Sequence, residues 1–221
     1  MLRRILMFLV DIVLCKIFHR AKYINREKEK NLKSCIICAN HSAMLEPAYI
    51  YVTSPKVYIM AKAELFKNNF FASIFKYFGI FPINRGNKDA GSLLHSINIA
   101  KKEGTRLLIF PEGTRIIDGK KSVPKVGPAF IACKSGVPIV PVYITRSPKA
   151  FSKVSVIYGD PIYVPSEYEN NKSKLYDISY DIMQEIYKLR DLDTTNNRKE
   201  EDKILNGKPP VEIVKRKSNE K

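Results

Sequence analysis

His41 and Glu46 stand five positions apart, directly after the apolar run Ser34–Ala39, which is typical of a buried strand. A carboxylate beside a histidine can hold one ring nitrogen protonated, which leaves the other nitrogen free to take a proton from a hydroxyl. Five positions on a regular helix would set the two side chains about 140° apart. We therefore expect a turn leading into a helix, with Pro47 in its first turn. The pair predicts a general base.

Two further polar clusters also follow strand-like runs. The run Arg106–Phe110 leads into the first cluster and the run Gly79–Ile83 into the second. The first cluster consists of Glu112, Gly113, Thr114 and Arg115, and the second of Arg85 and Gly86. Because all three polar clusters stand at the ends of such runs, we interpret them as one site assembled from loops.

Four sequence blocks in this order resemble the glycerolipid acyltransferase family, which includes the 1-acylglycerol-3-phosphate acyltransferases. The family pattern is His, four residues, Asp; then Pro-Ile-x-Arg; then Phe-Pro-Glu-Gly-Thr-Arg; then Val-Pro-Ile-Val-Pro. The chain carries these blocks, within roughly residues 36 to 145, at His41–Glu46, Pro82–Arg85, Phe110–Arg115 and Val137–Pro141. It departs from the pattern at one position, where Glu46 replaces the aspartate of the family.

The resemblance implies a role for each of the matching residues. His41 would deprotonate an acceptor hydroxyl that attacks the acyl donor directly, without an acyl-enzyme, and Glu46 would orient His41. Arg85 and Arg115 would hold a phosphate, because a guanidinium suits that anion, and Gly86 would allow close approach.

Four more residues are implied to contact substrates. Glu112, Gly113 and Thr114 would line the same cleft and help to bind the acceptor, whereas a mutual or surface ion pair of Glu112 with Arg115 is the structural alternative. Lys62 and Lys125 match positions that are often basic in the family, and each would steer phosphate or the phosphopantetheine of the donor. A solvated surface position is the alternative for both lysines.

The exchange of aspartate for Glu46 has a physical consequence. Glutamate is one methylene longer, so on an unchanged backbone its carboxylate overshoots or must fold back. A misplacement of about 1 Å can cost on the order of 10²-fold in rate. Either the local backbone compensates, or the chain is a slow or altered member of the family.

Composition restricts the class of partner. The 221 residues are sufficient for one domain with a sizeable core, and the formal net charge of +16 implies an anionic partner. Residues 1–34 carry nine Lys and Arg residues against three acidic ones, so much of the excess lies at the start of the chain. No basic module with interleaved aromatics, helix-turn-helix or zinc pattern is present, which argues against nucleic acid as a partner.

Residues 1–18 are nearly continuous apolar sequence, interrupted by Asp11 and Lys16. This run is shorter than the ~20 residues needed to span a bilayer, and it lacks a small-residue cleavage site. We expect an uncleaved helix that embeds in one leaflet, with the basic residues of 16–33 on anionic headgroups. An apolar helix packed on the body of the protein is the alternative.

Strand-like and helical runs alternate along the rest of the chain, which predicts an α/β fold with a central mixed sheet flanked by helices. The expected strands are Ser34–Ala39, Val57–Ala61, Gly79–Ile83, Arg106–Phe110, Ile139–Ile144 and Val154–Tyr158. The expected helices are Glu46–Val52, Glu64–Tyr77, Asp89–Glu103, Gly127–Ser135 and Ser173–Arg190. This divides the chain into a membrane-associated segment (1–33), an acyltransferase-like domain (34–190) and a polar, flexible tail (191–221).

Cys35 and Cys38 have the spacing of a metal or redox pair, but they lie in a predicted strand. Side chains three positions apart on a strand point to opposite faces, so we expect buried, inert thiols. No metal-ligand cluster appears in the sequence, and the implied chemistry requires neither a metal nor a cofactor.

The resemblance implies a membrane-associated O-acyltransferase of phospholipid synthesis. The donor would be an acyl thioester of acyl carrier protein or coenzyme A, the acceptor 1-acylglycerol 3-phosphate, and the product phosphatidic acid. A bacterial protein of this kind would lie on the cytoplasmic face of the inner membrane. Two alternatives remain: a relative that acts on another lysophospholipid or an acylated amino-acid lipid, and a catalytically weak protein that only binds lipid surfaces.

Overall fold

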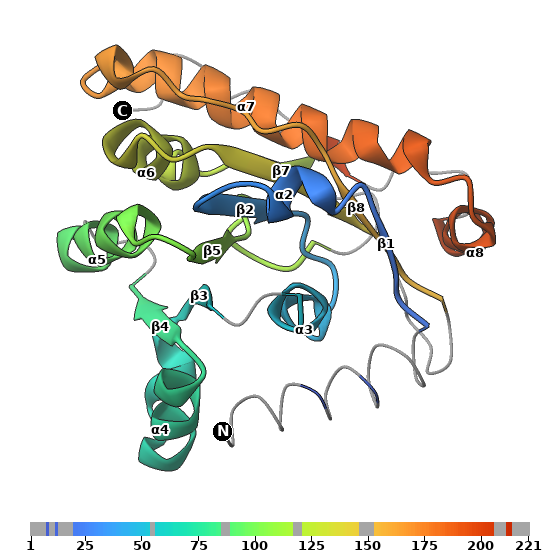
Figure 1. Cartoon of the computed structure of the whole chain (residues 1–221), viewed down its shortest axis with the longest axis horizontal. Helices are drawn as coiled ribbons and strands as arrows, with labels where there is room; N and C mark the ends of the chain where they lie inside the picture. The colour runs from blue at the N-terminus through green and yellow to red at the C-terminus, as the bar shows by residue number, and fades with distance from the viewer. Residues whose placement is uncertain are drawn as a thin grey trace.

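The computed structural model of the chain describes residues 20–53, 56–84, 89–116, 121–145, 153–205 and 211–213, together with Phe8 and Ile12. A seven-stranded sheet with the strand order β1-β8-β7-β2-β5-β3-β4 forms its centre. Every neighbouring pair in this sheet is parallel except β7 and β8, which are antiparallel. The predicted α/β fold with a central mixed sheet flanked by helices is therefore confirmed (Figure 1).

The strands of the large sheet are β1 (Lys22–Ile24), β2 (Cys35–Ala39), β3 (Val57–Lys62), β4 (Ile80–Ile83), β5 (Arg106–Ile109), β7 (Ile139–Ile144) and β8 (Ser155–Tyr158). A separate two-stranded sheet pairs β6 (Lys121–Ser122) with β9 (Glu212–Ile213). The helices are α2 (Glu27–Lys30), α3 (Glu46–Tyr51), α4 (Asn69–Tyr77), α5 (Ala90–Lys101), α6 (Gly127–Ser135), α7 (Lys172–Lys188) and α8 (Asn196–Leu205). Short 3₁₀ segments are η2 (Ala63–Phe66), η3 (Ser166–Tyr168) and η4 (Leu189–Leu192).

β2 is the strand around which the core is built. All five of its residues are buried, because β5 and β7 flank it and helices cover both of its faces. Ile36 and Cys38 face one hydrophobic cluster, whereas Cys35 and Ile37 face the other. Cys35 and Cys38 thus point to opposite faces as expected, and burial raises the pKa of the Cys35 thiol to about 12.

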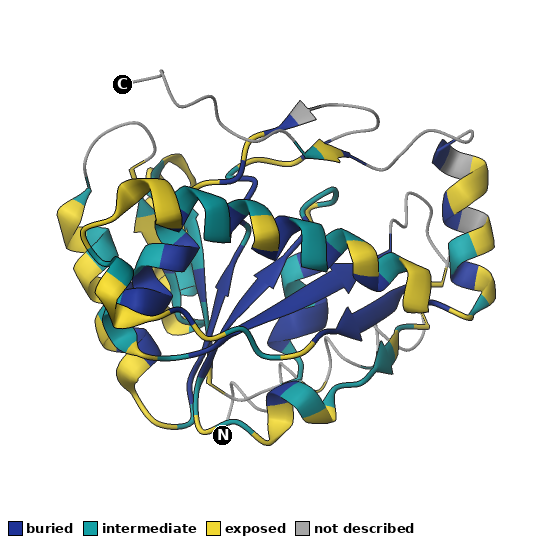
Figure 2. Ribbon diagram, turned by 90° about the horizontal axis from the view of Figure 1, so that it is seen from above, coloured by how far each residue is buried: buried dark blue, intermediate teal, exposed yellow. Residues whose placement is uncertain are grey.

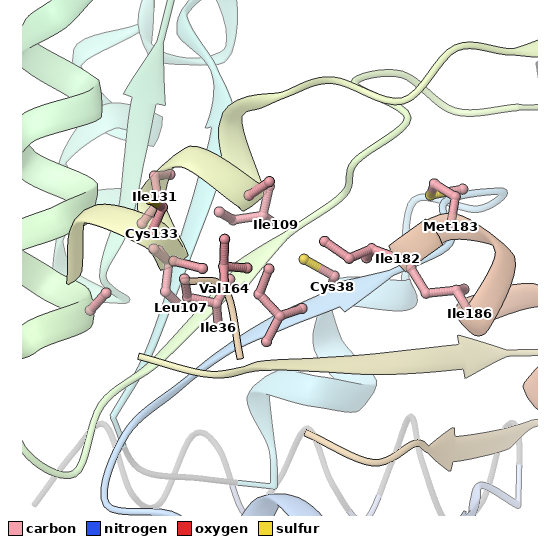
Figure 3. Close-up of a cluster of buried hydrophobic side chains, with 14 of the residues drawn as sticks. Ile36, Cys38, Leu107, Ile109, Ile131, Cys133, Val164, Ile182, Met183 and Ile186 are labelled. Carbon is pink, nitrogen blue, oxygen red and sulfur yellow. The ribbon is translucent and has the colours of Figure 1, made fainter. Parts of the chain in front are cut away.

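Helices cover the two faces of the sheet unequally. Side chains of α5, α6 and α7 form one cluster with β2 and β5, and Figure 3 shows Ile182 and Met183 of α7 in this cluster together with Cys38. On the other face, α3 contributes Tyr49 and Ile50 to the second cluster. The central strands are buried throughout, while the helices around them are exposed on their outer sides (Figure 2).

The helix predicted over Glu64–Tyr77 is divided into two in the structure. η2 ends at Phe66 and α4 begins at Asn69. Between them, the side-chain oxygen of Asn68 accepts hydrogen bonds from the backbone N–H groups of Phe70 and Phe71. This is the geometry of a helix N-cap, a position at which asparagine is strongly preferred.

The end of the predicted membrane-associated segment belongs to the folded body. Residues 22–24 form β1, which pairs with β8, so the domain begins before residue 34. Glu29 in α2 is buried and forms an ion pair with Arg106, whose guanidinium also donates to the backbone carbonyls of Glu29, Leu32 and Lys33. Two of the cations in this segment contact the protein: Lys28 pairs with Asp160 and Arg26 donates to a backbone carbonyl.

The described part of the predicted tail is also ordered. α8 buries Asn197, Glu201 and Leu205, and Glu201 forms an ion pair with Arg190 while accepting a hydrogen bond from Tyr143 at 2.7 Å. The sequence pattern misses this helix because its few inward-facing groups are mostly polar, and their burial is stabilised by partners distant in the sequence.

The apolar run of residues 1–18 lies outside the described residues, apart from Phe8 and Ile12. Among the described residues, no helix has the length and hydropathy required to cross a membrane.

Breaking the buried ion pair of Arg106 should destabilise the fold. Arg106→Met would leave the Glu29 carboxylate buried without its partner, so we expect the free energy of unfolding to fall by about 3–5 kcal/mol in urea denaturation. Lys134→Met is the matched control, because the Lys134–Glu169 pair is partly exposed and its loss should cost less than about 1 kcal/mol. Equal losses in the two variants would contradict this view of Arg106.

Candidate active site

Asn40 fixes the point at which the chain leaves β2. Its amide donates to the backbone carbonyl of Ile144 at 3.0 Å, and its side-chain oxygen accepts from the N–H of Ile144 at 2.7 Å. This buried side chain continues the pairing of β2 with β7 one residue beyond the end of β2. His41 therefore starts from a rigid position at the carboxyl edge of the sheet.

The carboxylate of Glu46 holds the ring of His41. Oε2 of Glu46 lies 2.8 Å from Nδ1 of His41, and the side chain of Glu46 is only 2% exposed. The same carboxylate accepts two hydrogen bonds from the N–H of Ser42, at 2.8 and 3.0 Å, and a third from the Ser42 hydroxyl. The turn between the two residues and the helical start at Glu46 are as predicted, with Pro47 in the first turn of α3.

The loop after β5 holds the backbone of His41. The N–H of His41 donates to Oε2 of Glu112 at 3.1 Å, and its carbonyl accepts from the N–H of Ile116 at 2.8 Å. Both backbone hydrogen-bonding groups of His41 are thereby satisfied by one segment, which lies 71 or more residues further along the chain. This segment therefore fixes the backbone of His41, while Glu46 holds its ring.

Aromatic side chains complete the surroundings. The ring of Phe110 stacks on the imidazole of His41, with ring centroids 4.1 Å apart and an interplanar angle of 23°. Tyr187 of α7 donates its hydroxyl hydrogen to Oε1 of Glu112 at 2.7 Å. Both oxygens of Glu112 therefore accept hydrogen bonds from the protein, and the side chain acts on His41 from a buried position.

This arrangement suits proton transfer at one nitrogen of His41. Nδ1 is held by Glu46, so the neutral ring carries its proton there and Nε2 has a free lone pair. The side chain of His41 is 16% exposed, so it is not closed off from solvent. When Nε2 takes a proton, Nδ1–H still donates to the buried carboxylate of Glu46, and Phe110 remains stacked on the ring.

Three of the remaining predicted site residues lie in the loop that follows Glu112. Thr114 and Arg115 are exposed in the loop between Glu112 and Ile116, while Gly113 has a φ of +70°. The aliphatic part of Lys125 lies so close to Gly113 that a Cβ there would be 3.2 Å from Cγ and Cε of the lysine. The left-handed backbone conformation favours glycine here, and a larger residue would also displace the side chain of Lys125.

Lys62 ends β3, and its amine pairs with Glu64 at 2.9 Å, which lowers the pKa of that carboxyl. Strand β3 runs parallel to β4 and β5, so its carboxyl end places Lys62 at the same edge of the sheet as His41. Arg85 and Gly86 lie outside the described residues. No group of three or more His, Cys, Asp or Glu side chains in the described ranges is arranged to hold a metal ion.

Four contacts of this site were missed by sequence reasoning. They are the amide of Asn40, the ring of Phe110, the N–H of Ile116 and the hydroxyl of Tyr187. Asn40 directly precedes His41, and Phe110 opens the Phe-Pro-Glu-Gly-Thr-Arg motif, so their positions could have drawn attention to them. For Tyr187, 75 residues away from Glu112, the sequence offers no signal.

Comparisons with known proteins agree with this fold. The family model described as Acyltransferase matches residues 20–145. The 1-acyl-sn-glycerol-3-phosphate acyltransferase of Streptococcus pneumoniae is 32% identical over 189 residues, which cover 82% of this chain and 70% of that protein. The corresponding protein of Bacillus subtilis is 30% identical over 150 residues, or 64% of this chain and 73% of the relative.

One similar solved structure is the 1-acyl-sn-glycerophosphate (LPA) acyltransferase PlsC from Thermotoga maritima. It matches with a TM-score of 0.63 over 87% of this chain and 82% of that chain, at 22% sequence identity. At this identity, the likeness supports the fold alone.

The tautomer of His41 can be measured directly. We expect the neutral ring to carry its proton on Nδ1, because Glu46 accepts a hydrogen bond there, and Glu46→Ala should shift the proton toward Nε2. Imidazole ¹⁵N chemical shifts in a two-bond ¹H–¹⁵N spectrum report the tautomer, and the chain has three histidines to assign. His95, whose ring packs edge-on against Phe81, is the internal control and should not respond. A wild-type ring protonated on Nε2 would contradict the proposed role of Glu46.

Proposed function

This chain belongs to the Acyltransferase family, and from that we propose that it is a membrane-associated O-acyltransferase of phospholipid synthesis. The donor is an acyl thioester of acyl carrier protein or coenzyme A. The acceptor is the sn-2 hydroxyl of 1-acyl-sn-glycerol 3-phosphate, and the product is phosphatidic acid. The names of the similar proteins support this acceptor. The apolar sequence of residues 1–18 supports membrane association, and the proposed site of action is the cytoplasmic face of a bacterial membrane.

The observation that carries the proposal is the contact between Nδ1 of His41 and the buried carboxylate of Glu46. In the proposed reaction, Nε2 of His41 takes the proton of the acceptor hydroxyl as its oxygen attacks the thioester carbonyl carbon. The tetrahedral intermediate then collapses, the carbon–sulfur bond breaks, and the leaving thiolate recovers the proton from His41. One ester forms, one thioester is consumed, and the histidine returns to its neutral state.

Phosphate binding is assigned to Arg85 and Arg115 in this proposal. Arg115 is exposed and lies three residues after Glu112, in the loop that holds the backbone of His41. This position supports its assignment to the phosphate. A guanidinium at this position can pair with the phosphate oxygens of the acceptor while the hydroxyl approaches His41. Gly86, Thr114, Lys62 and Lys125 are proposed to border the same binding region.

The test is acyl transfer by the purified full chain in detergent or vesicles. Lysophosphatidic acid is supplied with acyl carrier protein and coenzyme A thioesters in separate reactions, and a panel of other lysophospholipids is run beside it. Formation of phosphatidic acid supports the proposal. If only another acceptor gave product, the proposed substrate would be overturned. If no acceptor gave product, the proposed activity would be overturned.

Removing the general base should abolish most of the turnover. We expect His41→Ala to lower kcat by about 10²–10⁴-fold, because a positioned base typically contributes that much. The binding of acceptor and donor should change little, so KM is expected to stay near its wild-type value. His95→Ala is the matched control and should retain full activity. Near-normal turnover in the His41 variant would exclude the proposed mechanism.

Glu46→Asp tests whether the longer carboxylate suits this backbone. Glu46 reaches both His41 and Ser42 from the first residue of α3, and a side chain shorter by one methylene cannot keep both sets of contacts. We expect kcat to fall on the order of 10- to 100-fold, since small displacements of a catalytic group have effects of that size. Glu167→Asp, on the exposed segment η3, is the control. A faster Asp variant would instead mean that Glu46 slows this chain.

A further inference from the structure

α4 is an apolar helix that the fold does not bury. None of its nine residues is buried, and none of the four residues of η2 before it is buried. The most exposed apolar side chains are Phe70 at 69%, Leu65 at 54% and Phe71 at 51%. A helix on a globular protein ordinarily turns its apolar stripe to the core, so this exposure requires a partner.

The aromatic side chains of this region contact one another. Phe66 and Phe75 meet edge-on with ring centroids 5.4 Å apart, and Phe71 lies between Phe70 and Phe75 at 5.7 and 6.4 Å. We call Leu65, Phe66, Phe70, Phe71 and Phe75 the aromatic patch. Ring contacts link its four phenylalanines across η2 and α4, and the N-cap at Asn68 lies between the two elements.

The aromatic patch is connected to the active site through α3. At the end of α4, the ring of Phe78 packs edge-on against Tyr51, with centroids 5.9 Å apart. Tyr51 is the last residue of the helix that begins with Glu46. Figure 1 shows α4 projecting from the edge strand β4, away from the layer of α6 and α7. The end of α4 is thus packed against α3, and η2 at the start of the patch follows β3 directly.

The start of the aromatic patch and the catalytic residues lie at the same edge of the sheet. β2, β5 and β3 run parallel, so η2 after β3 leaves the sheet at the edge where His41 and Glu112 lie. Two further exposed apolar residues occur at this edge in the loop beside His41, Met44 at 73% and Leu45 at 41%. Apolar surface therefore extends along the edge where substrates react.

We propose that the aromatic patch docks the protein on an anionic phospholipid bilayer, with the edge that carries His41 turned toward the membrane. Exposed Lys67 and Lys76 flank the aromatic side chains on the same segment, and the whole chain carries a net charge of +16. Apolar side chains beside lysines suit insertion into the interface of anionic lipids. This inference rests on the proposed function, because a lipid acceptor must reach the active site from the bilayer.

The chain contains no tryptophan, so a single introduced tryptophan reports its own surroundings. In Phe70→Trp, we expect the emission to shift to shorter wavelength on vesicles of dioleoyl phosphatidylglycerol and dioleoyl phosphatidylcholine, and brominated phosphatidylcholine should quench it. Tyr163→Trp is the matched control, because Tyr163 is 67% exposed and far from the patch. It follows Ile162, which bridges to β7, and three strands (β2, β5 and β3) lie between β7 and β4 in the sheet. Its emission should not change.

A second variant tests the contribution to binding. Phe70→Ser/Phe71→Ser should lower the vesicle partition coefficient at least about tenfold, because two aromatic side chains leave the interface. Tyr163→Ser should have no effect. Acyl transfer to a short-chain, water-soluble lysophosphatidic acid should be unchanged in the double variant, while transfer to the long-chain acceptor in vesicles should fall with the loss of binding.

Three outcomes would overturn the docking proposal. They are vesicle binding with no response of Phe70→Trp, absence of vesicle binding by the wild type, and an emission already at short wavelength without vesicles. The last would mean that another part of the chain or a second copy covers the patch. If the wild type acylates none of the acceptors, the proposed function fails, and the fluorescence result still decides the docking surface.

Discussion

The parallel pairing of β2 with β5 and β7 is the constraint on which the site depends. The register aligns Cys38 with Ile109, so His41 and Glu112, each three residues further on, leave the sheet at the same level. The hydrogen bond between the N–H of His41 and the Glu112 carboxylate continues this alignment beyond the strands. On the other side of β2, the amide of Asn40 extends the pairing with β7. A slip of one residue would turn every one of these side chains to the other face.

The charged groups buried around His41 are acidic, whereas the chain as a whole is basic. The chain as a whole is strongly basic, yet two buried carboxylates, Glu46 and Glu112, surround His41. Each carboxylate accepts several hydrogen bonds, which offsets the cost of removing it from water. The two buried carboxylates thus hold the ring and the backbone of His41, while the net positive charge of the chain favours anionic partners.

The carboxyl-terminal helices extend this network away from the site. Tyr187 of α7 contacts Glu112, and its ring packs edge-on against that of Tyr143 with centroids 5.8 Å apart. Burial raises the pKa of Tyr143 well above its usual value, so the phenol stays protonated and donates to Glu201 of α8. Glu201 in turn pairs with Arg190. A polar segment that resembles a tail in the sequence thus supports, through two tyrosines, the residue that holds the backbone of His41.

The sequence by itself determined the α/β class, the six longest strands, the turn that joins His41 to a carboxylate and the family to which these motifs belong. Local periodicity and motif spacing carry that information, because neighbours in the chain are neighbours in space. Only the tertiary structure decided that Glu112 holds the backbone of His41, that Glu29 pairs with Arg106, and that α8 is buried. These contacts join residues between 58 and 77 positions apart. Their partners are selected by strand register and helix packing, and no local pattern records that selection.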